Sequence, residues 1–142
     1  MKHLVLLFSL VYCVVSFGQD KSELQDDSES LTGPKIYFTE TSFDFGDINQ
    51  GDKVEHTFEF ENTGNEPLIL SDVRTTCGCT APEWPREPIA PGKKAKLKVV
   101  FNSTGKMGVQ NKVITVMSNS VNNPARVKII TNVLPKESGG SR

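Results

Sequence analysis

Apolar and polar residues alternate along much of the chain between residues 35 and 134, a pattern typical of strands with one buried face. Residues 54–61 show it most clearly, and residues 94–101 repeat it. We expect the inward positions to be Val54, His56, Phe58, Phe60, Ala95, Leu97, Val99 and Phe101. The outward positions are Glu55, Thr57, Glu59, Glu61, Lys94, Lys96 and Lys98.

Seven such segments are separated by turn residues such as Asn49-Gln50-Gly51-Asp52 and Ala90-Pro91-Gly92-Lys93. The segments are 35–39, 42–48, 54–61, 68–73, 95–101, 109–117 and 126–133. None has helical periodicity, and the connections leave no room for the crossover helices that a parallel sheet requires. We therefore predict an all-β fold, a seven-stranded antiparallel immunoglobulin-like β-sandwich.

The outward faces of residues 54–61 and 94–101 carry opposite charges, glutamates on the first and lysines on the second. An immunoglobulin-like strand order makes these two segments neighbours in one sheet. The sequence therefore predicts a ladder of cross-strand ion pairs. A patch that binds anions is the functional alternative for the lysines.

The N-terminus has the form of a secretory signal peptide. Lys2 and His3 precede an apolar run from Leu4 to Val15, and small residues stand at Ser16 and Gly18. An uncleaved anchor is the alternative, although the run is shorter than the roughly 20 residues that span a bilayer. We therefore expect a periplasmic or secreted protein with no membrane span after signal removal.

The rest of the chain divides into three parts. Residues 19–34 are acidic and poor in apolar side chains, which predicts a disordered linker after the signal peptide at residues 1–18. Residues 35–134 are expected to form one immunoglobulin-like domain, followed by a disordered tail at residues 135–142. The net charge of −1, with both signs interspersed, argues against nucleic acid as a partner.

The motif Cys77-Gly78-Cys79-Thr80 is the candidate chemical site, and three interpretations stay open. The thiols can form a structural disulfide, since a kink at Gly78 brings residues i and i+2 within bridging distance. They can instead form a redox-active pair, with Arg74 near in sequence to favour a thiolate. They can also bind Cu(I) or zinc, but a closed zinc site needs four ligands. We therefore assign no metal site and no cofactor.

Trp84 lies in the proline-rich stretch 81–88, which is expected to be irregular or polyproline II-like. Trp84 is a candidate lid over the cysteines or a contact for a partner, and the alternative is that it covers one end of the core. His56 is expected to be a core histidine with one hydrogen bond. Met107 and Met117 suit copper, but their positions fit packing equally well.

Support for catalysis is thin. Once the signal peptide is removed, the chain has one histidine, no Ser/His/Asp set and no glycine-rich phosphate loop. The acidic side chains lie at outward strand positions or near the ends of the chain. We therefore expect that the protein is not an enzyme.

Several short motifs follow one another in a specific order along the chain. Together they resemble a bacterial secreted family of unknown function that carries a Cys-Gly-Cys-Thr motif. The motifs are Phe43-Asp44-Phe45-Gly46-Asp47-Ile48, Phe58-Glu59-Phe60-Glu61-Asn62-Thr63-Gly64, Cys77-Gly78-Cys79-Thr80, Ile89-Ala90-Pro91-Gly92 and Ser118-Asn119. That family is itself similar to immunoglobulin-like domains of the hydin and major-sperm-protein type. The resemblance implies a seven-stranded sandwich and export, and it implies no activity.

The functional expectation is an exported immunoglobulin-like module with a non-catalytic binding or structural role in the bacterial cell envelope. Its partner would be an envelope protein, a glycan, or a second copy bound along exposed strand edges. The alternative is a thiol redox or copper-handling protein that uses Cys77 and Cys79.

Overall fold

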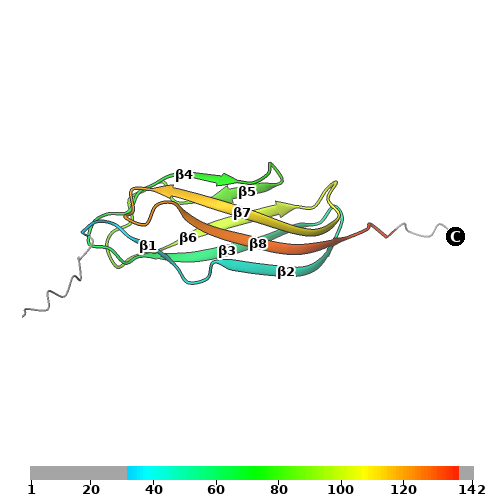
Figure 1. Ribbon diagram of the computed structural model, residues 1–142, viewed down its shortest axis with the longest axis horizontal. Coiled ribbons are helices and arrows are strands. Elements are labelled where there is room, and N and C mark those ends of the chain that lie inside the picture. The colour runs from blue at the N-terminus through cyan, green and yellow to red at the C-terminus, as the bar shows by residue number, and fades with distance from the viewer. Residues whose placement is uncertain (1–31, 138–142) are drawn as a thin grey trace, which may run out of the picture.

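A computed structural model describes residues 32–137, which form eight strands in two packed sheets and no helix (Figure 1). One sheet has the order β1 (Ile36–Phe38), β3 (Lys53–Asn62), β6 (Lys94–Asn102) and β5 (Thr80–Glu83). The other has the order β2 (Ser42–Asn49), β8 (Ala125–Leu134), β7 (Gly108–Ser118) and β4 (Leu70–Thr75). The predicted immunoglobulin-like β-sandwich is confirmed. The expected signal peptide, residues 19–31 of the linker and the last five residues lie outside this range.

The eighth strand is β5, in a stretch that we expected to be irregular. The strand has only four residues and contains Pro82, so neither its length nor its composition resembles a strand. It lies at an edge of the sheet and pairs with β6 alone, where a proline can be accommodated. The strand count is therefore eight, one more than predicted.

The sandwich is not wholly antiparallel, because β2 runs parallel to β8. A parallel pair requires a long connection between its strands, which usually contains a helix. Here β2 and β8 are the second and the last strands of the chain, and the strands between them provide that connection. No crossover helix is needed.

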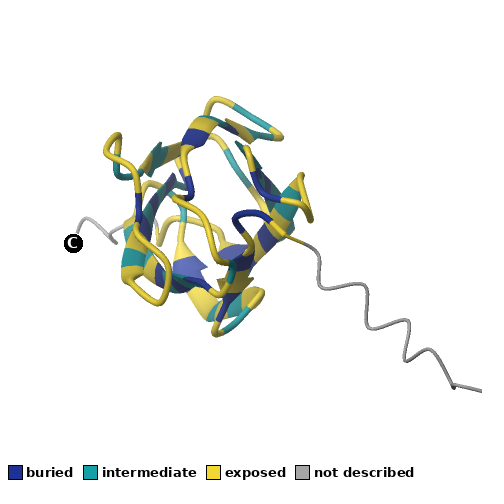
Figure 2. Ribbon diagram, turned by 90° about the vertical axis from the view of Figure 1, so that its left-hand side faces the viewer, coloured by how far each residue is buried: buried dark blue, intermediate teal, exposed yellow. Residues whose placement is uncertain are grey.

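The core is made by the inward faces of both sheets, where the alternation predicted them. Buried and exposed positions alternate along the strands (Figure 2). The core residues of the β3–β6 sheet include Phe58, Phe60, Leu97, Val99 and Phe101, all fully buried. They face Ile114, Val116, Val127, Ile129 and Val133 of the opposite sheet. Each such side chain stabilises the fold by roughly 1.5–3 kcal/mol relative to exposure.

The predicted ion pairs form on the outer face of the β3–β6 sheet. Lys94 pairs with Glu59 at 3.3 Å and Lys98 with Glu55 at 3.2 Å. Both pairs are diagonal, because Lys96 lies directly opposite Glu59 and Val100 lies directly opposite Glu55. The hydrogen bond to Glu55 raises the pKa of Lys98. The side chains are exposed, so the ladder contributes little stability and mainly keeps this face polar.

The body of the domain begins earlier than the expected boundary at residue 34. Gly33 and Pro34 are buried, and both hydrogen-bond to the loops at this end of the sandwich. The loop at Gly64 passes so close that a Cβ there would lie 2.1 Å from the Gly33 carbonyl oxygen. The side chain of buried Asn62 accepts from the amides of Lys35 and Gly64, which ties the two segments together. Residues 33 and 34 therefore belong to the packed body.

Replacing Gly64 with alanine is expected to destabilise the domain by about 2–4 kcal/mol, because the new methyl group would meet main-chain atoms that cannot move independently. Gly78→Ala is the matched control, since nothing lies within 4 Å of its Cβ position. We expect the control to change the free energy of unfolding by less than about 0.5 kcal/mol. Urea denaturation of both variants measures this, and equal effects would contradict the close approach.

Candidate functional site

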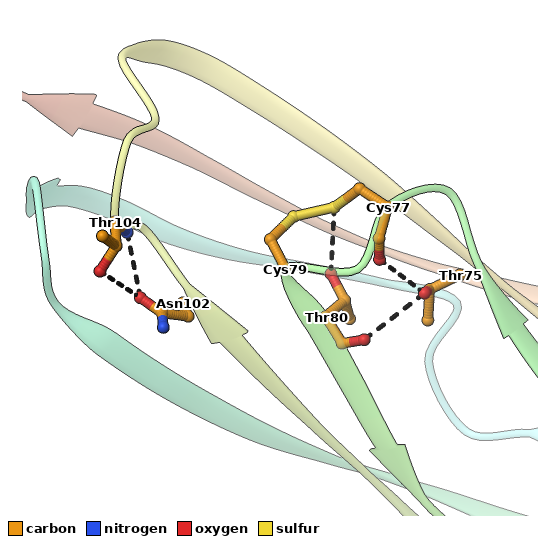
Figure 3. Close-up of a disulfide and its surroundings, with 6 residues drawn as sticks. All are labelled: Thr75, Cys77, Cys79, Thr80, Asn102 and Thr104. Atoms are coloured by element: carbon orange, nitrogen blue, oxygen red, sulfur yellow. Dashed lines mark hydrogen bonds between the residues drawn. A yellow bond between two sulfur atoms is a disulfide. The ribbon is translucent and has the colours of Figure 1, made fainter.

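Cys77 and Cys79 form a disulfide in the loop that carries the chain from β4 to β5 (Figure 3). The bend in this loop brings their Cα atoms to 5.4 Å, within the usual range for a disulfide. Both residues are half-buried, and Cys79 packs against the edge of the core. Of the three interpretations of the motif, the structure therefore shows the sulfurs bonded to each other.

Hydrogen bonds fix the same loop without help from the sulfur atoms. The Thr75 hydroxyl donates to the Cys77 carbonyl at 2.8 Å (Figure 3), and the Thr76 amide donates to the Val113 carbonyl at 3.2 Å. On the other side of the bridge, the Asn102 amide donates to the Cys79 carbonyl at 2.9 Å. The loop is therefore attached to β7 and to β6 by its backbone.

The structure does not bring the other predicted site residues to the disulfide. The Arg74 guanidinium is 73% exposed and bonds the Asp72 carboxylate at 2.7 Å, which lowers the pKa of Asp72. Trp84 follows Glu83, which pairs with Lys98, whereas Cys79 bonds to Asn102 four residues further along β6. Trp84 and the disulfide thus lie at opposite ends of β5, so the tryptophan does not cover the sulfurs.

Trp84 instead forms one wall of a shallow groove of about 530 Å³ beside β6. The other lining residues are Glu83, Pro85, Lys94, Ala95, Lys96 and Lys98. The Trp84 ring packs partly against the core, and the Arg86 guanidinium lies 3.8 Å from its centroid. Its buried indole N–H has no hydrogen-bond partner within residues 32–137. Trp84 therefore both covers the end of the core and presents a surface to the groove.

The hydrogen-bond pattern of β5 explains why this groove exists. Opposite residues of an antiparallel pair alternate between bonded and non-bonded positions. Cys79 and Asn102 form a hydrogen-bonded pair, so the alternation makes Glu83 and Lys98, four residues further on, a hydrogen-bonded pair as well. Pro82 then falls at a non-hydrogen-bonded position. Pro85 would be the next bonded residue, and proline has no N–H to donate. The strand ends before it.

The early end of β5 leaves part of β6 uncovered. The main-chain groups of Lys94 and Lys96 point to the side that β5 vacates, and they have no main-chain partner in the described part of the chain. The Lys96 ammonium also forms no ion pair with any described residue, unlike those of Lys94 and Lys98. We call this groove, with the uncovered segment Lys94–Lys96 and the wall of Trp84 and Pro85, the edge groove.

The edge groove was not predicted from the sequence. The alternation places the lysines on an outward face, and the prolines place Trp84 in an irregular loop, with nothing to bring them side by side. Two features of the sequence are consistent with it: the Trp84-Pro85 pair, and the length of the β6 segment, which extends beyond β5. Finding it requires the register between β5 and β6, which sequence alone does not fix.

His56 is a packed side chain, as expected. Its Nε2 pairs with a carboxylate oxygen of Glu40, and its ring stacks on Phe43 with centroids 3.6 Å apart. Met117 of β7 lies opposite Asp72 of β4, and Met107 is exposed. Within residues 32–137 no group of three or more His, Cys, Asp or Glu side chains is placed to share a metal ion. No helix in that range is long and apolar enough to cross a membrane.

Comparison with known proteins gives a family and a fold. The sequence profile of a family described as "Protein of unknown function (DUF1573)" matches residues 36–133. No curated protein matches the chain significantly.

Several solved structures share the fold at low sequence identity. A protein of unknown function from Porphyromonas gingivalis W83 is 20% identical with a TM-score of 0.63, over 72% of this chain and 48% of that one. The ASH/PapD-like domain 7 of human CEP192 is 14% identical with a TM-score of 0.57, over 72% and 87%. The YadV chaperone is 17% identical with a TM-score of 0.51, over 75% and 55%. The chain spans only about half of the Porphyromonas protein and 23% of the secreted Vibrio cholerae protease VesC.

Replacing both cysteines with serine is expected to lower the free energy of unfolding by no more than about 1.5 kcal/mol. The bridge closes a loop between residues only two apart, so it removes little entropy from the unfolded chain. The hydrogen bonds of Thr75 and Asn102 keep the loop in place. Urea denaturation of the double variant measures the effect. A loss above about 3 kcal/mol would show that the bridge is a structural clip.

Proposed function

Because the chain belongs to the DUF1573 family of proteins of unknown function, we propose its role from its geometry: an exported, non-catalytic module that binds an extended polypeptide segment in the edge groove. The observation that carries this proposal is the uncovered segment of β6. Its free N–H and C=O groups can form the main-chain hydrogen bonds of an added strand. The groove beside them gives that strand's side chains a surface to contact.

The four strands at the sheet edges are poorly suited to strand addition. β1 and β5 are three and four residues long, and β5 contains a proline. β2 and β4 are longer, but each is interrupted by a register irregularity, between Asp44 and Asp47 and between Leu70 and Asp72. Short strands, prolines and bulges protect natural sheet edges from unwanted pairing. The uncovered part of β6 is also short, and β3 likewise extends beyond β1. However, β6 pairs with β3 without a register irregularity, and the groove walled by Trp84 lies beside it, which makes it the preferred edge.

The proposed ligand is polypeptide rather than glycan or nucleic acid because of the kind of groups that the groove offers. Lys94 and Lys96 are two residues apart on one edge, so their main-chain groups repeat at about 6.8 Å, the spacing of alternate residues in a partner strand. Trp84 provides an apolar surface for one side chain of that strand. A chaperone, YadV, is among the structural neighbours, which supports testing a polypeptide first.

Export to the periplasm or beyond is part of this proposal. The N-terminal pattern of residues 1–18 supports it, and so does the disulfide, since disulfides persist in oxidising compartments. The partner would then be a protein of the cell envelope.

A photo-reactive amino acid in place of Lys96 is expected to cross-link a discrete partner protein in intact cells that produce the protein. The same substitution at Lys128, exposed on the central strand β8 that pairs with β2 and β7, is the control and should give no such product. Mass spectrometry of the product identifies the partner, and fractionation shows its compartment. Equal labelling from both positions, or products confined to the cytoplasm, would contradict the proposal.

A proline at position 96 tests the hydrogen bonds directly. Lys96→Pro removes an N–H that points to the free edge, so the pairing of β6 with β3 is kept while an added strand loses a donor. Lys96→Gln is the matched control that removes the charge alone. We expect the cross-link from a probe at Lys94 to fall at least about tenfold in the proline variant and less than about twofold in the glutamine variant. Equal losses would show that charge, not strand addition, governs binding.

A further inference from the structure

We propose that Cys77–Cys79 is a thiol–disulfide exchange site that accepts two electrons from a pair of thiols in another protein. The edge groove does not use this disulfide, which lies at the other end of β5. The inference is therefore independent of the proposed binding function. Four observations carry it: the small ring, the backbone bonds that hold the loop, the partial exposure of both residues, and the hydroxyl beside one sulfur.

The first two observations bear on how easily the bridge is reduced. Folding and disulfide formation are linked, so a bridge that stabilises the fold is itself protected from reduction to the same extent. The ring closed here spans residues only two apart, which limits that protection to about tenfold. Structural disulfides resist reduction because the fold protects them much more strongly. The folded protein therefore leaves this pair close to the reactivity of the same residues in a free peptide.

Reduction also leaves the loop in place. The carbonyls of Cys77 and Cys79 keep their hydrogen bonds from Thr75 and Asn102, and Thr76 stays attached to Val113. The two sulfurs stay next to each other, so the bridge can re-form without refolding. A site that cycles between dithiol and disulfide needs this property.

A donor beside one sulfur distinguishes the two cysteines. The Thr80 hydroxyl lies 3.9 Å from the Cys77 Sγ (Figure 3), and a disulfide sulfur has no hydrogen, so the hydroxyl is the donor. When the bridge is cleaved, a hydrogen bond to a thiolate is stronger than one to a neutral sulfur. Cys77 is therefore the leaving group, and the partner's sulfur attacks Cys79. Thr80 is a positioning residue for this step.

The exchange is balanced as follows. A thiolate of the partner attacks the Cys79 Sγ, the S–S bond breaks, and the Cys77 sulfur leaves as a thiolate that takes up a proton from solvent. The partner's second thiol, as its thiolate, attacks its own sulfur in the mixed disulfide and releases the Cys79 sulfur, which is protonated in turn. The partner loses two electrons and two protons and gains a disulfide, while Cys77 and Cys79 become thiols.

The first test measures the equilibrium in the intact protein. The protein and a free peptide of residues 75–82 are equilibrated with about 10 mM reduced and about 0.1 mM oxidised glutathione, trapped by alkylation and weighed. We expect a reduced fraction of at least about a tenth and an equilibrium constant within about tenfold of the peptide's. A protein that stays more than about 99% oxidised has a structural bridge, which would overturn the proposal.

The second test follows electrons from a protein thiol pair, with reduced, unfolded ribonuclease as the probe. The oxidised protein is expected to gain about two daltons as the probe loses about two, and the Cys77→Ser/Cys79→Ser variant should leave the probe unchanged. If glutathione reduces the bridge but the probe stays reduced, exchange with proteins is excluded.

Variants of Thr80 test the assignment of Cys77 as the leaving group. Thr80→Val is expected to slow reduction by glutathione by about three- to tenfold, and Thr80→Ser should restore the rate, because only the hydroxyl matters. Thr104→Val is the matched control at the same end of the domain (Figure 3), since its hydroxyl bonds to Asn102. If Thr80→Ser is as slow as Thr80→Val, or Thr104→Val is equally slow, the hydroxyl has no role.

Discussion

The pairing of β3 with β6 is the constraint on which the rest of the structure depends. Nine consecutive residue pairs, from Lys53–Asn102 to Glu61–Lys94, fix the register of the two central strands. A slip of one residue would invert one of the two strands, which would turn its apolar side chains, Phe58 or Leu97 among them, out of the core and its charged residues into it. The same register decides which N–H groups of β6 point to β3 and which point to the opposite side. It thereby sets both the core and the chemistry of the sheet edge.

The short strand β5 pairs with only part of the β6 edge that faces away from β3. At one end it is continuous with the disulfide loop, whose carbonyl at Cys79 bonds to Asn102. At the other end it stops before Pro85 and exposes Lys96. The two candidate sites are thus consequences of where one four-residue strand begins and ends. Loops and strand ends are commonly the parts of a sandwich that carry function, because the packed faces are committed to the core.

Much of this fold could be predicted from alternation alone. The inward sets of β3 and β6 face the core as predicted, because a two-residue period leaves only one way to bury Phe58 and Phe60. Val54, His56 and Ala95 of these sets are only partly buried. The ion pairs followed from the same pattern. β5 was missed because four residues with a proline carry no strand signal, and the parallel β2–β8 pair was missed because it joins distant segments. The edge groove depends on a register between strands, and the bonding of the two thiols depends on the bend of their loop, so neither could be read from local sequence.

Amide hydrogen exchange along β6 tests the account most directly. If β5 ends where the bonding pattern requires, the amide of Lys96 has no partner, whereas its neighbour Leu97 bonds to β3 and Val100 bonds to β5. Exchange followed by NMR should then show Lys96 at least about a hundredfold faster than both, after correction for intrinsic rates. An amide of Lys96 as protected as that of Leu97 would mean that this edge of β6 is already occupied. The claim that β6 has an uncovered edge at Lys94–Lys96 would then be wrong.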